Sequence, residues 1–117
     1  MKKIYYLSSC DTCKRILNQL KPLGDIELQD IKSDPITPEQ LKAMRNLAGS
    51  YEALFSRRAR LFSERQLKDQ QLEEKDYEAL ILEHYTFLKR PVILVNNQIF
   101  IGNSKKVITT ANETIHS

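Results

Sequence analysis

Cysteine is scarce in this sequence of 117 residues, which has two, and no run of apolar residues is long enough to cross a membrane. The apolar stretch that follows Met1-Lys2-Lys3 is also too short for a signal peptide. We therefore expect a cytoplasmic protein without a membrane partner. In such a reducing compartment, cysteines are more often catalytic or redox-sensing than structural.

Histidine is equally scarce, and this bears on metals. His84 is expected to pack on a helix face, and this histidine together with the one cysteine pair falls short of a four-ligand zinc site. The net charge of +3 is slight, and neither a helix-turn-helix nor a strong basic patch is evident. We expect no metal, no bound cofactor and no direct binding to DNA.

The two cysteines stand close together, as Cys10 and Cys13 of a C-x-x-C motif. A strand is predicted just before them at residues 2–7, and an amphipathic helix at about 11–21. Strand, C-x-x-C and helix form the local pattern of a thioredoxin-like redox site. The first helical turn carries unpaired N–H groups and a partial positive charge, which would favour a Cys10 thiolate. The alternative is a pair of small buried apolar residues at the end of a strand.

The order of the remaining elements extends this prediction to a whole fold. Further strands are predicted at 25–31, 92–95 and 98–102, the last two as an antiparallel hairpin. Helices are predicted from the Thr37 cap to Gly49, over 73–88, and after the Ser104 cap. We expect an α/β protein with a thioredoxin-like mixed β-sheet (βαβ…ββα). It would form one domain over residues 1–117, with a helical insertion at about 37–88 between the halves.

Two further positions carry candidate chemistry. Arg90-Pro91 precedes an apolar strand, where a thioredoxin-like fold holds a cis proline beside the cysteine pair. Arg90 would then lie near the thiolate and be able to bind an oxyanion. The alternative is a trans proline that begins a strand and an exposed arginine, and the local sequence leaves both open. Residues 57–60 contain three arginines, for which a solvated basic face is the simplest interpretation.

These motifs together make the chain resemble the arsenate reductase/Spx family of ArsC-like proteins, over essentially its whole length. The resemblance is carried by Ser9-Cys10-x-x-Cys13-Lys14-Arg15, by Ser56-x-Arg58-Ala59-Arg60-Leu61-Phe62, by Arg90-Pro91-Val92-Ile93, and by Gly102.

The resemblance implies a role for each matching residue. Cys10 matches the nucleophile, Arg58 and Arg90 match the arginines that bind the oxyanion, and Pro91 matches the cis proline. In such a reductase the Cys10 thiolate attacks arsenate, glutathione and glutaredoxin resolve the adduct, and arsenite leaves.

The sequence departs from the arsenate reductases at three places. Cys13 adds a second cysteine, Gly102 stands where those enzymes carry a third arginine, and Tyr6 stands where they carry a histidine. The first two features are those of Spx-like regulators.

Three functions follow from these observations. The first is a reductase with Cys10 as nucleophile and Cys13 as resolving thiol, acting on arsenate or on a disulfide or glutathione adduct, with glutaredoxin or thioredoxin as partner. The second is an Spx-like regulator that binds RNA polymerase and uses a Cys10–Cys13 disulfide as its switch. The third is a thioredoxin-like domain with vestigial cysteines. We rank the enzyme first, because the chain lacks the longer tail of Spx proteins, and the regulator close behind.

Overall fold

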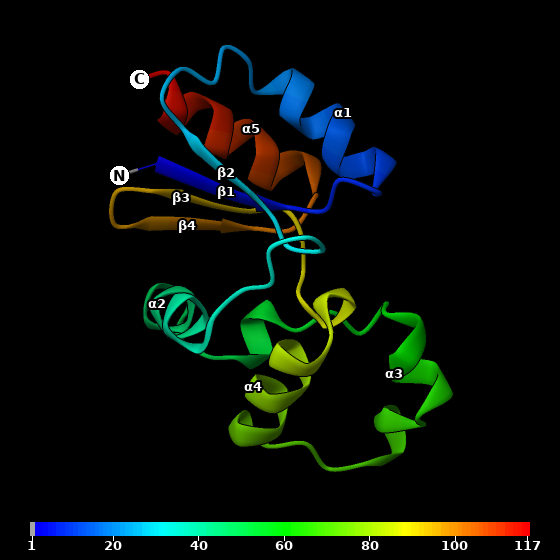
Figure 1. Cartoon of the computed structure of the whole chain (residues 1–117). Helices are drawn as coiled ribbons and strands as arrows, with labels where there is room; N and C mark the ends of the chain where they lie inside the picture. The colour runs from blue at the N-terminus through cyan, green and yellow to red at the C-terminus, as the bar shows by residue number, and fades with distance from the viewer. Residues whose placement is uncertain (1) are drawn as a thin grey trace. The chain divides into compact units, whose positions relative to one another are not determined.

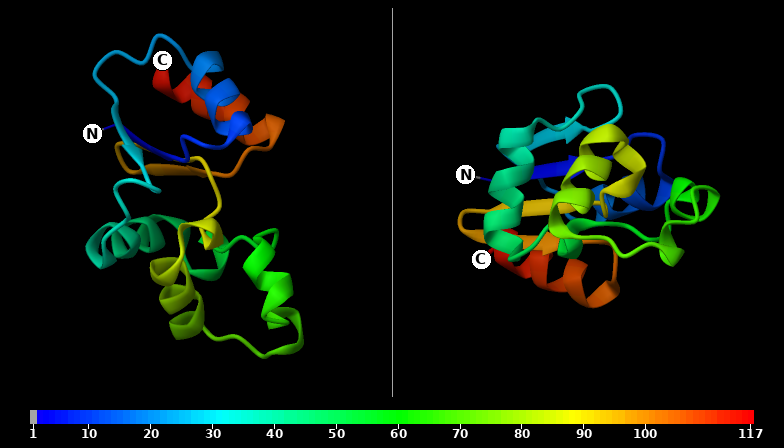
Figure 2. Two further views of the ribbon diagram at one scale, coloured as in Figure 1. Left: turned by 45° about the vertical axis from the view of Figure 1, so that its right-hand side comes forward. Right: turned by 90° about the horizontal axis from the view of Figure 1, so that it is seen from below.

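The computed structural model describes residues 2–117 and divides them into two units. One unit comprises the chain up to Asp34 together with Arg90–Ser117, and the other is Pro35–Lys89. The first unit contains the sheet and both cysteines, whereas the second consists of helices and their connections (Figure 2). The expectation of one domain with an insertion at about 37–88 stays a prediction.

The sheet of the first unit has four strands in the order β2-β1-β3-β4. They are β1 (Lys2–Tyr6), β2 (Glu27–Asp30), β3 (Val92–Val95) and β4 (Gln98–Ile101). β1 runs parallel to β2 and antiparallel to β3, and β3 and β4 form an antiparallel pair. The predicted mixed sheet is therefore confirmed.

Two helices, α1 (Asp11–Gln19) and α5 (Lys105–Ile115), lie on one face of this sheet (Figure 1). Ser104 caps α5 as predicted, because its Oγ accepts a hydrogen bond from the Val107 amide at 3.2 Å. Buried aliphatic side chains from both helices and from the strands form the core of the unit. They are Ile4, Ile16, Leu20, Ile93, Val95, Ile108, Ala111 and Ile115.

Strand β2 differs from its prediction, since it covers Glu27–Asp30 and not all of 25–31. It is an edge strand, and Leu28 is left 43% exposed. Gln29 is only 5% exposed, and its side-chain amide donates to the Asp34 carbonyl at 2.9 Å, so the buried amide remains hydrogen-bonded inside the protein. The polar side chain of this strand is thus buried while an apolar one faces solvent.

A charged residue is buried in β1 for a similar reason. Lys3 stands opposite Glu27 in the parallel pair, and its Nζ lies 2.8 Å from a Glu27 carboxylate oxygen. The same ammonium group lies 4.8 Å from the centre of the Tyr5 ring. The partner on the neighbouring strand makes burial of the lysine tolerable.

In the second unit, helix α2 (Pro38–Ala48) begins and ends as predicted. Thr37 Oγ1 accepts from the Gln40 amide and Gln40 Oε1 accepts from the Thr37 amide, both at 3.1 Å, which is a capping box. Gly49 ends the helix with φ of +96°, a left-handed conformation that glycine adopts without strain.

The prediction of a continuous helix over 73–88 is wrong at its end. Helix α4 (Glu74–Glu83) stops before His84, whose backbone is extended. The Nδ1 atom of His84 accepts a hydrogen bond from the Thr86 amide at 3.2 Å and so caps the next turn. His84 therefore does not pack on the helix face. The remaining short elements are η1 (Glu52–Leu54), α3 (Arg60–Glu64), η2 (Leu67–Asp69) and η3 (Tyr85–Phe87).

An aromatic cluster around Phe55 forms the core of the second unit. The ring of Phe55 is fully buried and its centre lies 5.9 Å from that of Phe62, 4.9 Å from Tyr77 and 5.3 Å from Phe87. Phe55 also pairs with Leu88 in a short antiparallel bridge. These contacts join the middle of the unit to the segment just before its C-terminal end.

Among the helices within residues 2–117, none combines the length and the apolar content that crossing a membrane requires.

We expect Phe55→Ala to lower the free energy of unfolding by about 3–5 kcal/mol, because it removes buried area and leaves a cavity among three rings. Leu47, which is 38% exposed on α2, provides the matched control. Leu47→Ala should cost less than about 1 kcal/mol. Urea denaturation followed by circular dichroism measures both, and equal losses in the two variants would contradict the assignment of Phe55 to the core.

Candidate functional site

Cys10 is positioned by the turn that joins β1 to α1. It is the N-cap residue of α1, with φ of −99° and ψ of 114°, and its amide donates to the Leu7 carbonyl at 3.0 Å. Its own carbonyl accepts the first helical hydrogen bond, from the Lys14 amide at 3.1 Å. The sulfur of Cys10 is therefore held at the helix end where backbone N–H groups lack partners within the helix.

The two cysteines differ in their access to solvent. Cys13 is fully buried, with 0% of its surface exposed, whereas Cys10 is partly exposed. Both are free thiols. A reagent in solution therefore meets Cys10 before it meets Cys13.

The pKa of the Cys10 thiol is lowered from its ordinary value. Partial burial acts in the opposite direction, but hydrogen bonds outweigh it. The backbone and the thiol of Cys13, the positive charge of Arg90 and the backbone of Thr12 all favour the thiolate. Hydrogen bonding to the charged form and a nearby cation both favour a thiolate.

The pKa of the Cys13 thiol is raised to about 11, chiefly because burial disfavours its thiolate. A Cys10 thiolate adds to this rise through its negative charge and through the hydrogen bond that it accepts from the Cys13 thiol. At neutral pH, Cys13 is thus a protonated donor to Cys10. The pair thus consists of one reactive thiol and one buried, protonated thiol.

Arg90 and Pro91 reach this place from the other half of the chain through the pairing of β1 with β3. Tyr5 stands opposite Val92 in that antiparallel pair, so residues 90–91 lie beside the end of β1. The Arg90–Pro91 peptide bond is cis, which confirms one of the two alternatives left open by the sequence. A second cis bond, Lys21–Pro22, had no sequence signal.

The backbone at Pro91 is fixed by the hairpin. Its carbonyl accepts a hydrogen bond at 2.9 Å from the amide of Gly102, which has φ of +91°. Pro91 itself is buried and Arg90 is partly buried. The geometry thus brings Arg90 and Pro91 to the cysteine pair, while their functional roles stay predictions.

Arg58 belongs to the second unit, in the turn before α3, and its side chain is exposed. The neighbouring arginines are engaged: Arg57 pairs with Glu52 at 2.9 Å and Arg60 pairs with Glu64 at 3.1 Å. Within residues 2–117, Arg58 forms no ion pair with a carboxylate. Of the arginines in this segment, Arg58 is the one left available to an external anion.

Asp30, the last residue of β2, is absent from the predicted site residues. Its carboxylate accepts hydrogen bonds from the Ser8 amide at 3.2 Å and from the Ser8 hydroxyl at 2.6 Å. The available signal was the parallel pairing of β1 and β2, which brings the carboxyl ends of both strands to one edge of the sheet. Alternation within each strand does not reveal which side chains meet there.

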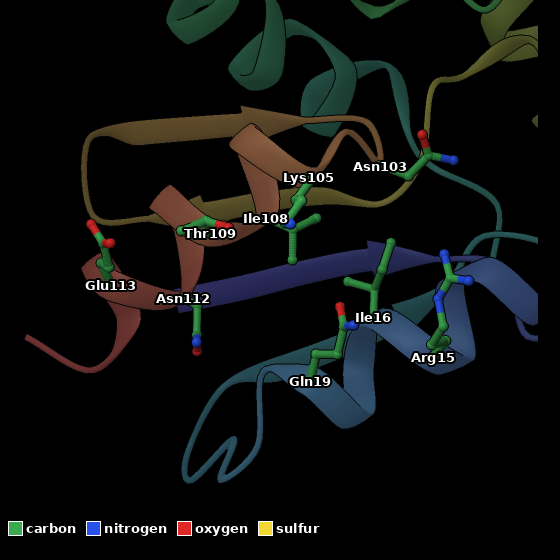
Figure 3. A pocket seen from close by; sticks show the side chains of 9 residues that line it. All are labelled: Arg15, Ile16, Gln19, Asn103, Lys105, Ile108, Thr109, Asn112 and Glu113. Carbon is green, nitrogen blue, oxygen red and sulfur yellow. The ribbon is translucent and has the colours of Figure 1, made fainter.

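A groove of about 480 Å³ lies between α1 and α5 on the first unit (Figure 3). Its apolar part includes Ile16 and Ile108, and polar side chains such as Arg15, Gln19 and Asn112 surround them. Neither cysteine lines this groove. It is therefore a surface separate from the cysteine pair.

Metal ligation gains no support from the arrangement of side chains. In the described part of the chain, no three His, Cys, Asp or Glu side chains lie close enough together to hold a metal ion.

Comparisons with known proteins point to one family. The model of the ArsC family matches residues 5–111. Two curated relatives, each a "Global transcriptional regulator Spx 2", are 28% identical to this chain. The Bacillus anthracis protein aligns over 87% of this chain and 79% of its own length. The Bacillus cereus protein aligns over 90% and 82%.

Among solved structures, the arsenate reductase from Vibrio cholerae superposes with a TM-score of 0.77 at 22% identity, over 97% of this chain and 96% of that chain. This likeness concerns the fold, and the predicted thioredoxin-like α/β fold is confirmed.

We expect iodoacetamide at pH 7 to alkylate Cys10 faster than Cys13, because the pKa of Cys10 is lowered and that of Cys13 is raised. Trypsin cleaves after Lys3 and Lys14, so both cysteines share one peptide and fragment ions must distinguish them. Equal and slow alkylation of both thiols would contradict the assignment of Cys10 as the nucleophile.

Arg90 supplies the matched variants for this measurement. Arg90→Ala removes a positive charge, raises the pKa of Cys10 and should slow its alkylation at pH 7 by roughly threefold to tenfold. Arg90→Lys retains the charge and should lie closer to the wild type.

Proposed function

This chain belongs to the ArsC family, and we propose that it is a thiol–disulfide oxidoreductase in which Cys10 is the nucleophile and Cys13 the resolving thiol. The observation that carries the proposal is the opposite displacement of the two pKa values at the start of α1, one lowered and one raised. A lowered pKa at a partly exposed thiol is typical of a reactive cysteine. A buried, protonated neighbour is suited to act second.

The first step is attack by the Cys10 thiolate on one sulfur of a disulfide or of a glutathione adduct. A new bond forms between Cys10 Sγ and that sulfur, the substrate S–S bond breaks, and the other sulfur leaves as a thiolate. Its proton comes from solvent. Arg90 stabilises the Cys10 thiolate before the attack.

The second step is attack by Cys13 on Cys10 Sγ. Once Cys10 is in a mixed disulfide it is neutral, so the repulsion and the accepted hydrogen bond that raise the pKa of Cys13 both disappear. Burial remains, but loss of the proton from Cys13 becomes easier. The Cys10–Cys13 disulfide forms, the second substrate sulfur leaves as a thiolate, and the substrate has gained two electrons. Glutathione with glutaredoxin, or thioredoxin, returns two electrons to the protein.

A small oxyanion is the second substrate class within this proposal. With arsenate, the Cys10 thiolate forms a sulfur–arsenic bond and an oxygen leaves as water. A second thiol, from glutathione or Cys13, then attacks Cys10 Sγ, and arsenic keeps the electron pair and leaves as arsenite. Arg58 and Arg90 would bind the oxyanion through their guanidinium groups, and Pro91 would hold the backbone beside the thiolate.

A regulator is the alternative function, and specific observations favour it. The curated relatives are named as Spx transcriptional regulators. The resemblance noted from the sequence also makes Cys13 and Gly102 features of the Spx-like kind. In this alternative, a Cys10–Cys13 disulfide is the switch and RNA polymerase is the partner. The same difference between the two thiols would make the switch responsive to oxidants.

The enzyme is tested by NADPH oxidation in the presence of glutathione, glutaredoxin and glutathione reductase, with either a glutathionylated peptide or arsenate as substrate. We expect turnover to fall at least about a hundredfold in Cys10→Ser, since the attacking thiolate is lost. Cys13→Ser should allow the first step and accumulate a mixed disulfide that mass spectrometry detects.

The two substrates distinguish disulfide reduction from oxyanion reduction. Arsenate turnover that falls in both Arg58→Ala and Arg90→Ala, without loss of folding, supports oxyanion reduction. Turnover of arsenate that survives both changes would contradict the role of these arginines. If neither substrate is turned over, the regulator becomes the favoured function.

The regulator is tested by capture of purified RNA polymerase on the immobilised chain, before and after treatment with diamide. We expect the amount captured to change upon oxidation of the wild type, because formation of the disulfide alters the start of α1. Cys10→Ser cannot form the disulfide and should not respond. Absence of capture in either redox state would contradict this alternative.

A further inference from the structure

The carboxylate of Asp30 ties two loops together at one edge of the sheet. Its Oδ2 accepts from the hydroxyls of Ser8 at 2.6 Å and Ser33 at 3.2 Å. Its Oδ1 accepts from the amides of Ser8 and Lys32, both at 3.2 Å. Ser8 lies in the connection from β1 to α1, whereas Lys32 and Ser33 follow β2. One side chain thus holds both connections.

The Ser8 side of this network leads directly to the cysteines. Ser8 and Ser9 are the central residues of a turn that is closed by the hydrogen bond from the Cys10 amide to the Leu7 carbonyl at 3.0 Å. The Leu7 backbone also forms a hydrogen bond with the Cys13 sulfur. A shift of this turn would therefore move the surroundings of both thiols.

The network requires an ionised carboxylate. Four donors converge on two oxygens, so an amide at this position would direct its NH₂ group toward another donor. The pKa of Asp30 is lowered, first of all by the hydrogen bond from the Ser8 hydroxyl, so the group is ionised at neutral pH. Hydrogen bonds to a charged acceptor are stronger than those between neutral groups.

We infer that Asp30 is a positioning residue for Cys10: by holding Ser8, its carboxylate fixes the Leu7–Cys10 turn that places Cys10 at the N-terminus of α1. The inference rests on the proposed role of Cys10 as the reactive thiol and adds a residue to that site. Asp30 acts through Ser8, without contact with the reacting sulfur.

The charge of Asp30 and its hold on Ser8 have opposite effects on the pKa of Cys10, which makes the inference testable. The negative charge of Asp30, taken alone, disfavours a thiolate nearby, so its removal would lower the pKa of Cys10. If Asp30 no longer held Ser8, the Leu7–Cys10 turn would shift, the start of α1 would stabilise the Cys10 thiolate less, and that pKa would rise. Ser8→Ala removes the shortest hydrogen bond to the Asp30 carboxylate and leaves the charge of Asp30 in place.

The experiment measures the rate of Cys10 alkylation by iodoacetamide between pH 5 and 10 in the full chain. Wild type, Ser8→Ala, Asp30→Asn and Ser33→Ala are compared. Ser33→Ala is the matched control, because it removes one hydroxyl from the same carboxylate but lies in the connection after β2, outside the Leu7–Cys10 turn. The rate at Cys13, which is fully buried, reports in the same sample whether a variant has unfolded.

We expect Ser8→Ala and Asp30→Asn to move the midpoint of the pH profile upward and to lower the rate at pH 7. The alkylation rate at pH 7 should fall roughly threefold to tenfold, which corresponds to the loss of about one hydrogen bond that holds the turn in position. Ser33→Ala should follow the wild-type profile. A rate for Ser8→Ala within about twofold of wild type, or a faster rate for Asp30→Asn, would overturn the inference.

The wild-type measurement keeps this test separate from the proposed function. If Cys10 of the wild type reacts no faster than Cys13, the role of Cys10 as nucleophile fails, whatever the variants do. If Cys10 reacts fast and Ser8→Ala leaves its profile unchanged, the role of Cys10 stands and the positioning role of Asp30 fails.

Discussion

The site depends on favourable interactions of the first turn of α1 with a Cys10 thiolate. The backbone groups of Thr12 and Cys13 supply them, and a helix cannot use these N–H groups within itself. They outweigh the partial burial that would otherwise raise the pKa of Cys10. The turn after β1, the start of α1 and the burial of Cys13 all serve to keep this contact in place.

The sheet makes the contact possible by its order of strands. β1 lies between β2 and β3, so its carboxyl end is flanked by the end of one strand and the beginning of another. The parallel neighbour contributes Asp30, which holds the turn, and the antiparallel neighbour contributes Arg90 and Pro91. A central strand with one parallel and one antiparallel partner thus gathers residues from three places in the chain around one thiol.

Much of the fold could be predicted from the sequence, because the signals are local. The capping box at Thr37 and Gln40, the stop at Gly49 and the strand before Cys10 all depend on neighbouring residues. The predictions failed where a side-chain hydrogen bond that hydrophobic spacing does not encode accompanies the outcome. Gln29 of β2 is buried, and its side-chain amide donates to the Asp34 carbonyl. Helix α4 ends at Glu83 because the backbone of His84 is extended: its amide still donates to the Leu80 carbonyl, while its side chain accepts from the Thr86 amide.

For the site, the sequence by itself determined the spacing of the two thiols, their place at the start of a helix, and the family to which the chain is similar. These follow from residues that adjoin one another. Only the tertiary structure decided that Cys13 is buried while Cys10 is partly exposed, that Arg90 lies close enough to affect both, and that Asp30 holds Ser8. The reason is physical: burial and electrostatic interaction depend on distance in space, and the packing that buries Cys13 and brings Arg90 close joins residues that are far apart in the chain.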